Sequence, residues 1–126
     1  MIMSDHTSPR VIVPLRENWC CLRCGQWCKD RPHSLHHRRL RSALGHDSVP
    51  NLILLCGSGT TGCHGFVHAN PALSAQHGYL LSRYSADSAE TVPVKSWMWG
   101  YIYLLPDATV RLETEAEQRL RESYAC

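Results

Sequence analysis

Histidines at two places in this chain have the spacing of metal ligands. His64 and His68 are four residues apart in a segment of helical character, and side chains four apart share one helix face. These two imidazoles can therefore bind one ion together. His36 and His37 are neighbours in an expected strand, where adjacent side chains point to opposite faces. We expect one of this neighbouring pair to complete the metal site and the other to stay free.

A free imidazole beside a three-histidine metal site suits hydrolysis of a phosphate ester. A neutral imidazole can accept a proton from water near neutral pH. A divalent ion stabilises negative charge on the phosphate and on the leaving oxygen. Such hydrolysis requires no covalent intermediate with the protein. A single helical histidine is more often an ordinary surface or core residue, but the spacing of His64 and His68 favours ligands here.

Four of the seven cysteines have a spacing typical of structural zinc. Two residues separate Cys21 from Cys24, and Cys56 and Cys63 can supply two more thiolates once a strand returns to that pair. Six residues separate Cys56 from Cys63, and the run Gly-Ser-Gly-Thr-Thr-Gly between them is flexible enough for a wide turn. The sequence therefore predicts a four-cysteine Zn²⁺ site.

Two alternatives to this ligand set stay open. The cysteines can pair as disulfides in an oxidising compartment, and Cys20 or Cys28 can replace Cys21 as a ligand. We expect Cys20 and Cys28 to pack as small apolar groups, and Cys126 to be an exposed thiol in the tail.

The N-terminal residues have neither the charged start nor the apolar stretch of a secretory signal peptide. A reducing compartment is therefore the better expectation, and we predict a cytoplasmic protein, in the host cytoplasm if a phage encodes it. No apolar run approaches the ~18 residues that cross a bilayer, so no membrane partner is expected.

The charge of the chain is unevenly distributed. The net charge is only +2, yet residues 10–41 contain eight basic and two acidic residues, and residues 107–126 contain more acidic than basic ones. Arginine dominates the basic segment and makes forked contacts to phosphate oxygens, so this segment is the candidate phosphate-binding surface. An ordinary solvated surface is the alternative.

With 126 residues, 44% of them hydrophobic, the chain is expected to form a single α+β unit. Residues 1–18 are predicted to be an irregular arm, because Pro9 and Pro14 flank a short Val-Ile-Val run. The core is expected over residues 19–78. Its predicted elements are a cysteine-rich knuckle over 19–28, strands over 34–38 and 51–56, a helix from 62 or 63 to 69, and further helical turns over 71–77.

Residues 79–126 are expected to pack on that core. Their predicted elements are strands over 79–84 and 97–105, a hairpin strand over 109–112 and a helix over 114–124. Four aromatic residues of the 97–105 strand are expected to share one side and to pack there: Trp97, Trp99, Tyr101 and Tyr103.

Taken together, these features resemble the HNH endonuclease family, whose ββα-metal (His-Me) finger also occurs in colicin-type nucleases. The resemblance covers residues 19–78, and the small HNH proteins of bacteriophages look closest. It rests on three segments, which are Leu35-His36-His37-Arg38, Asn51-Leu-Ile-Leu-Leu-Cys56 and Gly62-Cys63-His64-Gly-Phe-Val-His68. Residues 92–97 and 100–105 are similar to the closing hairpin of those phage proteins.

The resemblance implies a zinc-stabilised ββα-metal domain with an additional C-terminal β-hairpin and short helix. It implies a metal-dependent DNA endonuclease that leaves 5′-phosphate and 3′-hydroxyl ends, acting in phage DNA processing or packaging. DNA is the implied partner, and a phage terminase is a candidate protein partner.

The resemblance also implies roles for individual residues. His36, His64 and His68 hold the catalytic ion, His37 is the general base, and Asn51 holds the finger loop and orients that base. The opposite assignment of His36 and His37 is the alternative, and Asn51 can also simply begin its strand. Many family members have Asp where His36 stands. The expected catalytic ion is Mg²⁺, Mn²⁺, Ni²⁺ or Zn²⁺, and a site of three histidines favours a transition metal over magnesium.

Three arginines follow the implied base directly and are candidates for contacts to the DNA backbone: Arg38, Arg39 and Arg41. A solvated face is again the alternative. The remaining histidines have no partner pattern and are expected to be solvated: His6, His33, His46 and His77.

Two further functions compete with the nuclease. One is a zinc-stabilised DNA-binding module that does not cleave, which would have no reason to keep a free histidine at His37. The other is a secreted disulfide-rich protein, which the missing signal peptide opposes.

Overall fold

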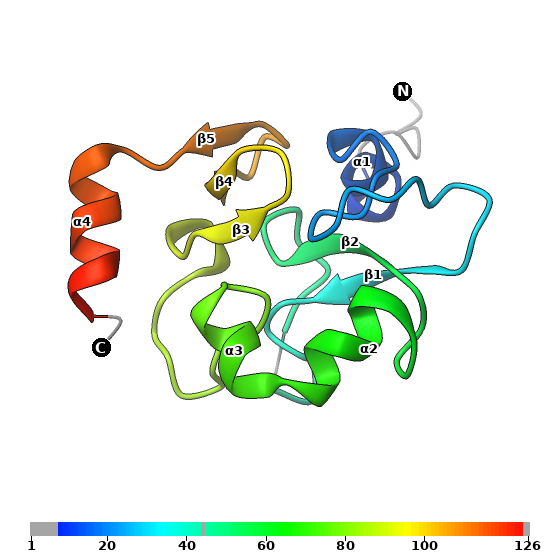
Figure 1. The fold of residues 1–126 in the computed structure, drawn as a ribbon, viewed down its shortest axis with the longest axis horizontal. Helices are drawn as coiled ribbons and strands as arrows, with labels where there is room; N and C mark the ends of the chain where they lie inside the picture. Colours follow the sequence, from blue (N-terminus) through cyan, green and yellow to red (C-terminus); the bar gives the residue numbers. More distant parts are fainter. Residues whose placement is uncertain (1–7, 44, 125–126) are drawn as a thin grey trace, which may run out of the picture.

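A computed structural model describes residues 8–43 and 45–124, so the expectations for His6 and Cys126 lie outside the described residues. The fold is mixed α and β, with two small antiparallel sheets (Figure 1). Its elements are α1 (Pro9–Arg16), β1 (His33–His37), η2 (Arg41–Ala43), β2 (Leu52–Cys56), α2 (Gly62–Ala69), α3 (Pro71–Gln76), η3 (Ala89–Thr91), β3 (Val94–Ser96), β4 (Gly100–Leu104), β5 (Val110–Leu112) and α4 (Glu115–Tyr124). In the described part of the chain, every helix is too short or too polar to span a membrane.

Strands β1 and β2 form the sheet that carries the histidines. They pair in antiparallel register, with His33 opposite Cys56 and His37 opposite Leu52. Every residue of β2 is buried, as its unbroken apolar run predicted. Helices α1 and α2 both pack against β2, which explains why neither of its faces is polar.

The predicted irregular arm is wrong for residues 9–16, which form α1. Pro9 occupies the first helical turn, where a missing N–H and a fixed φ favour a helix start. Pro14 lies inside the helix and is buried with Val13. Arg16 donates hydrogen bonds to the carbonyl oxygens of Val49 and Leu52. Burial against β2 thus stabilises a helix that the local sequence disfavours.

The predicted strand over residues 79–84 is also wrong. The N–H of Tyr79 donates to the carbonyl of Ser74, and the N–H of Leu81 donates to the carbonyl of Arg38. The carbonyl of Tyr79 bonds to the ring of His36. Because these backbone groups already have partners in α3 and next to β1, they do not form a β ladder.

The predicted strand over residues 97–105 is shorter than expected, because residues 97–99 form the turn between β3 and β4. Trp97 and Trp99 are both about half exposed, so the expected aromatic row does not form. The N–H of Trp97 donates to the carbonyl of Leu22. Its ring lies against Gly25, where an added Cβ would come within 2.6 Å of it. The turn is therefore docked on the cysteine knuckle, residues 19–28.

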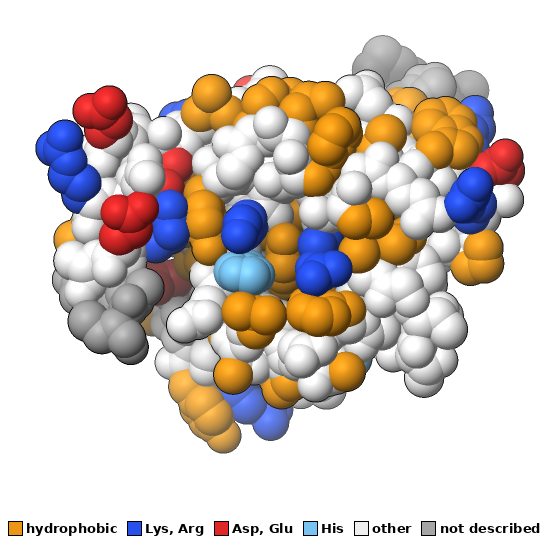
Figure 2. Space-filling view, in the orientation of Figure 1, with side chains coloured by type: hydrophobic (Ala, Val, Ile, Leu, Met, Phe, Trp, Pro, Cys, Tyr) orange, Lys and Arg blue, Asp and Glu red, His pale blue; other side chains and the backbone are white. Residues whose placement is uncertain are grey.

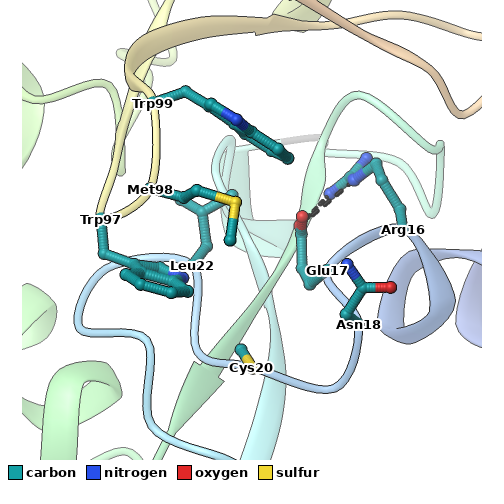
Figure 3. A pocket seen from close by; sticks show the side chains of 8 residues that line it. All are labelled: Arg16, Glu17, Asn18, Cys20, Leu22, Trp97, Met98 and Trp99. Carbon is teal, nitrogen blue, oxygen red and sulfur yellow. Dashed lines mark hydrogen bonds and ion pairs between the residues drawn. The ribbon is translucent and has the colours of Figure 1, made fainter.

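This turn and the end of α1 enclose a pocket of about 40 Å³ (Figure 3). Trp97, Met98 and Trp99 line one side, and the ion pair of Arg16 and Glu17 lines the other. Burial raises the pKa of the Glu17 carboxyl, which the charge of Arg16 only partly offsets. The pocket thus has one largely apolar wall and one charged wall.

Helix α4 is held by charged side chains. Arg121 pairs with Glu113 at 2.8 Å and lies over the ring of Tyr101, while Arg111 pairs with Glu117 at 2.8 Å. Figure 2 shows acidic and basic side chains next to one another over this helix. The Arg111–Glu117 pair is largely exposed and such pairs contribute little stability, so α4 is expected to detach more easily than α1 and α2, which pack against β2.

Acidification is expected to loosen α4. The Arg111 guanidinium, with further hydrogen bonds from Thr114, lowers the pKa of Glu117 from 4.5 to about 2. A lowered pKa means that the contribution of this carboxylate is fully present above about pH 4.5 and is lost as pH falls through about 2. NMR amide shifts of α4 should therefore change over this window in the wild type.

The variant Glu117→Gln provides the control for that titration. It is expected to loosen α4 already at pH 7 and to lack the additional acid-dependent change, since it has no titrating carboxyl at this position. Identical α4 shifts in the wild type and the variant throughout the titration would contradict the proposed role of the carboxylate.

Candidate metal centres

The three predicted ligand histidines lie together. One ring nitrogen from each of His36, His64 and His68 lies within 4.8 Å of the other two. His36 comes from β1, and the other two come from successive turns of α2, which contacts both strands of the sheet. The Nε2 atoms of His64 and His68 are 3.0 Å apart, as expected for side chains that share a helix face.

A backbone contact sets the orientation of His36. Its ring is buried, and Nε2 lies 2.8 Å from the carbonyl oxygen of Tyr79. Because a carbonyl only accepts hydrogen bonds, Nε2 donates and Nδ1 keeps its lone pair. Metal-binding histidines commonly use their second nitrogen in this way. Nδ1 is thus the atom that His36 can offer to an ion.

The electrostatics of the group favour neutral rings. Burial lowers the pKa of His36 to about 4, assisted by the neighbouring histidines and opposed by the Tyr79 carbonyl. Burial and then the charge of His68 also lower the pKa of His64. Neutral imidazole is the form that binds metals. Nδ1 of His64 is buried without a hydrogen-bond partner among the described residues, so the polar groups of this site are incompletely satisfied by the protein. The donor set fits a divalent transition metal.

The four predicted cysteine ligands form a second group. Their sulfurs all lie within 4.8 Å of one another, which brings together Cys21, Cys24, Cys56 and Cys63. All four are free thiols, so they do not form the disulfides that the sequence left open as an alternative. Cys20 and Cys28 are outside the group: Cys28 is buried, as expected, and Cys20 is half-buried. The four sulfurs can hold one metal ion.

Two members of this cluster, Cys21 and Cys24, disfavour the thiolate form when no cation is bound. The hydrogen bond with Cys63 and then burial raise the pKa of Cys21, and burial is the largest cause that raises the pKa of Cys24. A bound cation reverses this preference because it stabilises the thiolate directly. Arg23 adds a positive group, since its guanidinium donates to the sulfur of Cys63 at 3.3 Å and lies 3.7 Å from the ring centre of Phe66.

Glycine makes the wide spacing between Cys56 and Cys63 possible. Gly57 and Gly62 have φ angles of +86° and +61°, and a Cβ on Gly57 would come within 2.1 Å of the Thr61 carbonyl oxygen. The turn is compact enough for the N–H of Cys63 to donate to the sulfur of Cys56 at 3.3 Å. The six intervening residues therefore bring the two sulfurs together.

The two groups are linked through the start of α2. Cys63 and His64 are consecutive residues of this helix, yet Cys63 belongs to the sulfur group and His64 to the imidazole group. Asn70 alone separates α2 from α3, which begins at Pro71. An ion bound by the four cysteines would fix the first turn of the helix that carries two of the three histidines.

His37 and Asn51, the two predicted catalytic residues, lie on opposite sides of the loop between β1 and β2. His37 is outside the imidazole group, and its Nε2 is 2.5 Å from the carboxylate of Asp47. Asn51 is buried, accepts from the N–H of Arg39 and donates to the carbonyls of Arg39 and His46. Asn51 therefore ties both ends of the loop together.

The structure contradicts the prediction that Arg38 contacts DNA. Its side chain is fully buried and donates to the carbonyl oxygens of four residues, which are Pro50, Gly78, Ala89 and Val92. Arg39 is half-buried and donates to the carbonyls of Ser82, Ser85 and Asp87. Arg41 is exposed. Of the three predicted phosphate contacts, Arg41 is freely accessible, Arg39 is partly so, and Arg38 is a structural residue.

A basic group of Arg23, His77 and Lys95 was not apparent in the sequence. Burial lowers the pKa of His77, and the nearby charges of Lys95 and Arg23 lower it further. His77 is therefore not simply solvated as predicted, whereas His33 and His46 are exposed. Figure 2 shows basic side chains and a histidine gathered between α3 and β3. The fold brings these residues together from three distant segments, so no local motif could reveal them.

The comparisons with known proteins yielded no matching family model, curated protein or solved structure.

Proposed function

We propose that this protein is a metal-dependent DNA endonuclease of the HNH type, in which β1, β2 and α2 form a ββα-metal finger. The main observation behind the proposal is that four histidines have two different placements. Three of them converge through their ring nitrogens, while His37 stays outside that group on the adjacent position of β1. The four-cysteine site is proposed to bind Zn²⁺, the ion most often held by four thiolates in a structural site.

The proposed chemistry divides between an ion and the protein. A divalent ion such as Mg²⁺, Mn²⁺, Ni²⁺ or Zn²⁺, held by His36, His64 and His68, would supply charge stabilisation at the scissile phosphate and the leaving oxygen. His37 would accept a proton from the attacking water. Asn51 supports this role by fixing the loop that contacts His37. DNA would contact Arg41 and the basic group of Arg23, His77 and Lys95, all of which carry donors for phosphate oxygens.

Replacement of the proposed base tests this function directly. His37→Ala is expected to lower cleavage of supercoiled plasmid by about 10²- to 10⁴-fold, the usual contribution of a general base. Cleavage is measured with each of the four ions, using wild type and variant of equal zinc content. His46→Ala serves as the matched control, because His46 is an exposed histidine of the neighbouring loop. A wild-type protein that leaves the plasmid intact with every ion would refute the nuclease, and equal cutting by the His37 variant would refute the assigned base.

The ends of the products give a second test. Nicks with 5′-phosphate and 3′-hydroxyl ends are resealed by DNA ligase without prior treatment, whereas the opposite polarity is not. Ligation should therefore restore closed plasmid from the nicked product.

The competing function is a zinc-stabilised module that binds DNA without cutting it. The basic group of Arg23, His77 and Lys95 supports DNA binding independently of the histidine site. Retarded DNA in a gel, with no cleavage under any ion, would favour this module. The phage role and the terminase partner stay predictions of the family resemblance, and the cytoplasmic location stays a prediction of the sequence.

A further inference from the structure

A chain of hydrogen bonds connects His37 with two residues that the sequence pattern did not single out. Nε2 of His37 lies 2.5 Å from Oδ1 of Asp47, and Oδ2 of Asp47 accepts a hydrogen bond from Nε of Arg10 at 3.2 Å. The three side chains come from β1, the loop before β2, and α1. The histidine side chain is 11% exposed and the carboxylate 42% exposed, so the histidine is the more confined partner.

We propose that Asp47 is a positioning residue for the nuclease, which selects the tautomer of His37 that can accept a proton at Nδ1. The inference rests on the proposed function. It assigns to Asp47 no contact with DNA or with the reacting atoms. Arg10 is proposed to keep the carboxylate in place.

The tautomer follows from the chemistry of the two groups. An ionised carboxylate can only accept hydrogen bonds, so the Nε2 atom that faces it must carry hydrogen. A neutral imidazole has one N–H, which leaves the lone pair on Nδ1. In the proposed step, a proton moves from water to Nδ1, the oxygen of that water forms a bond to phosphorus, and the bond from phosphorus to the 3′ oxygen breaks. The 3′ oxygen leaves with the electron pair of that bond and takes a proton from solvent, which gives the 5′-phosphate and 3′-hydroxyl ends. The carboxylate stays ionised and stabilises the imidazolium that forms.

Two features keep Asp47 in this position. Asn51 donates to the carbonyl of His46, the residue next to Asp47, which restrains the loop. Arg10 then approaches from the other side of the carboxylate. The hydrogen bond from His37 and the charge of Arg10 both lower the pKa of Asp47, so its carboxyl is ionised at neutral pH. The helix that replaces the expected N-terminal arm therefore contributes a residue to the site.

The cleavage rate of Asp47→Ala distinguishes a positioning residue from a member of an ordinary surface ion pair. Pairs between exposed groups contribute little to stability, so Asp47→Ala should keep the fold and the zinc content of the wild type. If the pair were only structural, cleavage would also be unchanged. If Asp47 selects the tautomer, cleavage should fall although folding does not.

The test uses the full-length, zinc-loaded protein and has two measurements. The first is the ¹⁵N spectrum of the His37 imidazole at alkaline pH, where imidazoles are neutral. It should report Nε2–H in the wild type and a mixture of tautomers in Asp47→Ala. The second is plasmid cleavage. Asp47→Ala should lower kcat about 10- to 100-fold, which is no more than the usual contribution of a general base, and should leave KM for DNA within about twofold of the wild type. Asp47→Glu, which keeps a carboxylate, should recover part of the lost kcat.

The control is Asp87→Ala, which removes another exposed carboxyl group from a loop of the same protein. It should match the wild type in both measurements, and Arg10→Ala should lie between the wild type and Asp47→Ala. An active wild type with the Nδ1–H tautomer, or an Asp47→Ala variant that cuts as fast as the wild type, would overturn the positioning role alone. A wild type that leaves the plasmid uncut with each of the four ions would overturn the nuclease itself, and the positioning role with it.

Discussion

Removal of the ion that we propose for the four-cysteine site is expected to unfold most of the protein. The four sulfurs join three separate segments, which are the cysteine knuckle, the end of β2 and the start of α2. Cys21, Cys56 and Cys63 are themselves members of the hydrophobic core. Structural zinc contributes about 10–16 kcal/mol of binding free energy in small zinc domains. A domain of this size has a total stability of about 5–15 kcal/mol, so the fold should not persist without the ion.

Circular dichroism and thermal melting, with and without a strong chelator, measure this effect. Metal analysis of the freshly purified protein should give zinc, and chelated protein should lose its cooperative melting transition. Cys56→Ser should behave like the chelated wild type because it removes one ligand. Cys20→Ser is the matched control, since Cys20 lies in the same knuckle but outside the sulfur group. An apo protein with the melting curve of the zinc-loaded form would refute a structural ion here.

Replacement of Arg38 is the second change with a large expected effect. Its buried guanidinium donates to four carbonyl oxygens from three segments of chain that are far apart in sequence. Burial lowers the pKa of Arg38 to about 9, so the side chain stays charged at neutral pH. Arg38→Met keeps much of the volume but leaves those carbonyls without their donor. A buried acceptor left without its hydrogen-bond partner costs about 1–3 kcal/mol, and denaturant unfolding should show a loss of at least this size.

Two further variants distinguish the buried guanidinium of Arg38 from an ordinary surface charge. Arg38→Lys should also destabilise the protein, because an ammonium group cannot reproduce the forked geometry of guanidinium. Arg41→Ala removes an exposed arginine and should change the free energy of unfolding by less than about 0.5 kcal/mol. An Arg38→Met protein as stable as the wild type would contradict the structural role, and would return this arginine to the candidates for DNA contact.

Parts of the two ligand groups could be predicted because local rules govern them. Four-residue spacing puts His64 and His68 on one face of any helix, and the short gap between Cys21 and Cys24 restricts their sulfurs to one neighbourhood. The apolar run of β2 likewise predicts a buried strand wherever it occurs. These features depend on backbone geometry over a few residues, so they can be inferred before the fold is known.

The misplaced residues depend on contacts between distant segments. Arg38 looks like a phosphate ligand in sequence, and it is buried because the carbonyls of Pro50, Gly78, Ala89 and Val92 surround it. Residues 9–16 look irregular because they contain two prolines, yet packing on β2 favours a helix. Residues 79–84 look like a strand, but other partners have taken their backbone hydrogen bonds.

The amino-acid pattern thus specified which side chains could bind metal, since ligand chemistry and short spacings are local properties. Long-range packing specified how those side chains are supported. The Tyr79 carbonyl orients His36, and Asp47 faces His37 across a loop that Asn51 closes. Such partners cannot be inferred from spacing, because a hydrogen bond between distant residues requires the whole fold to bring its donor and acceptor within about 3 Å.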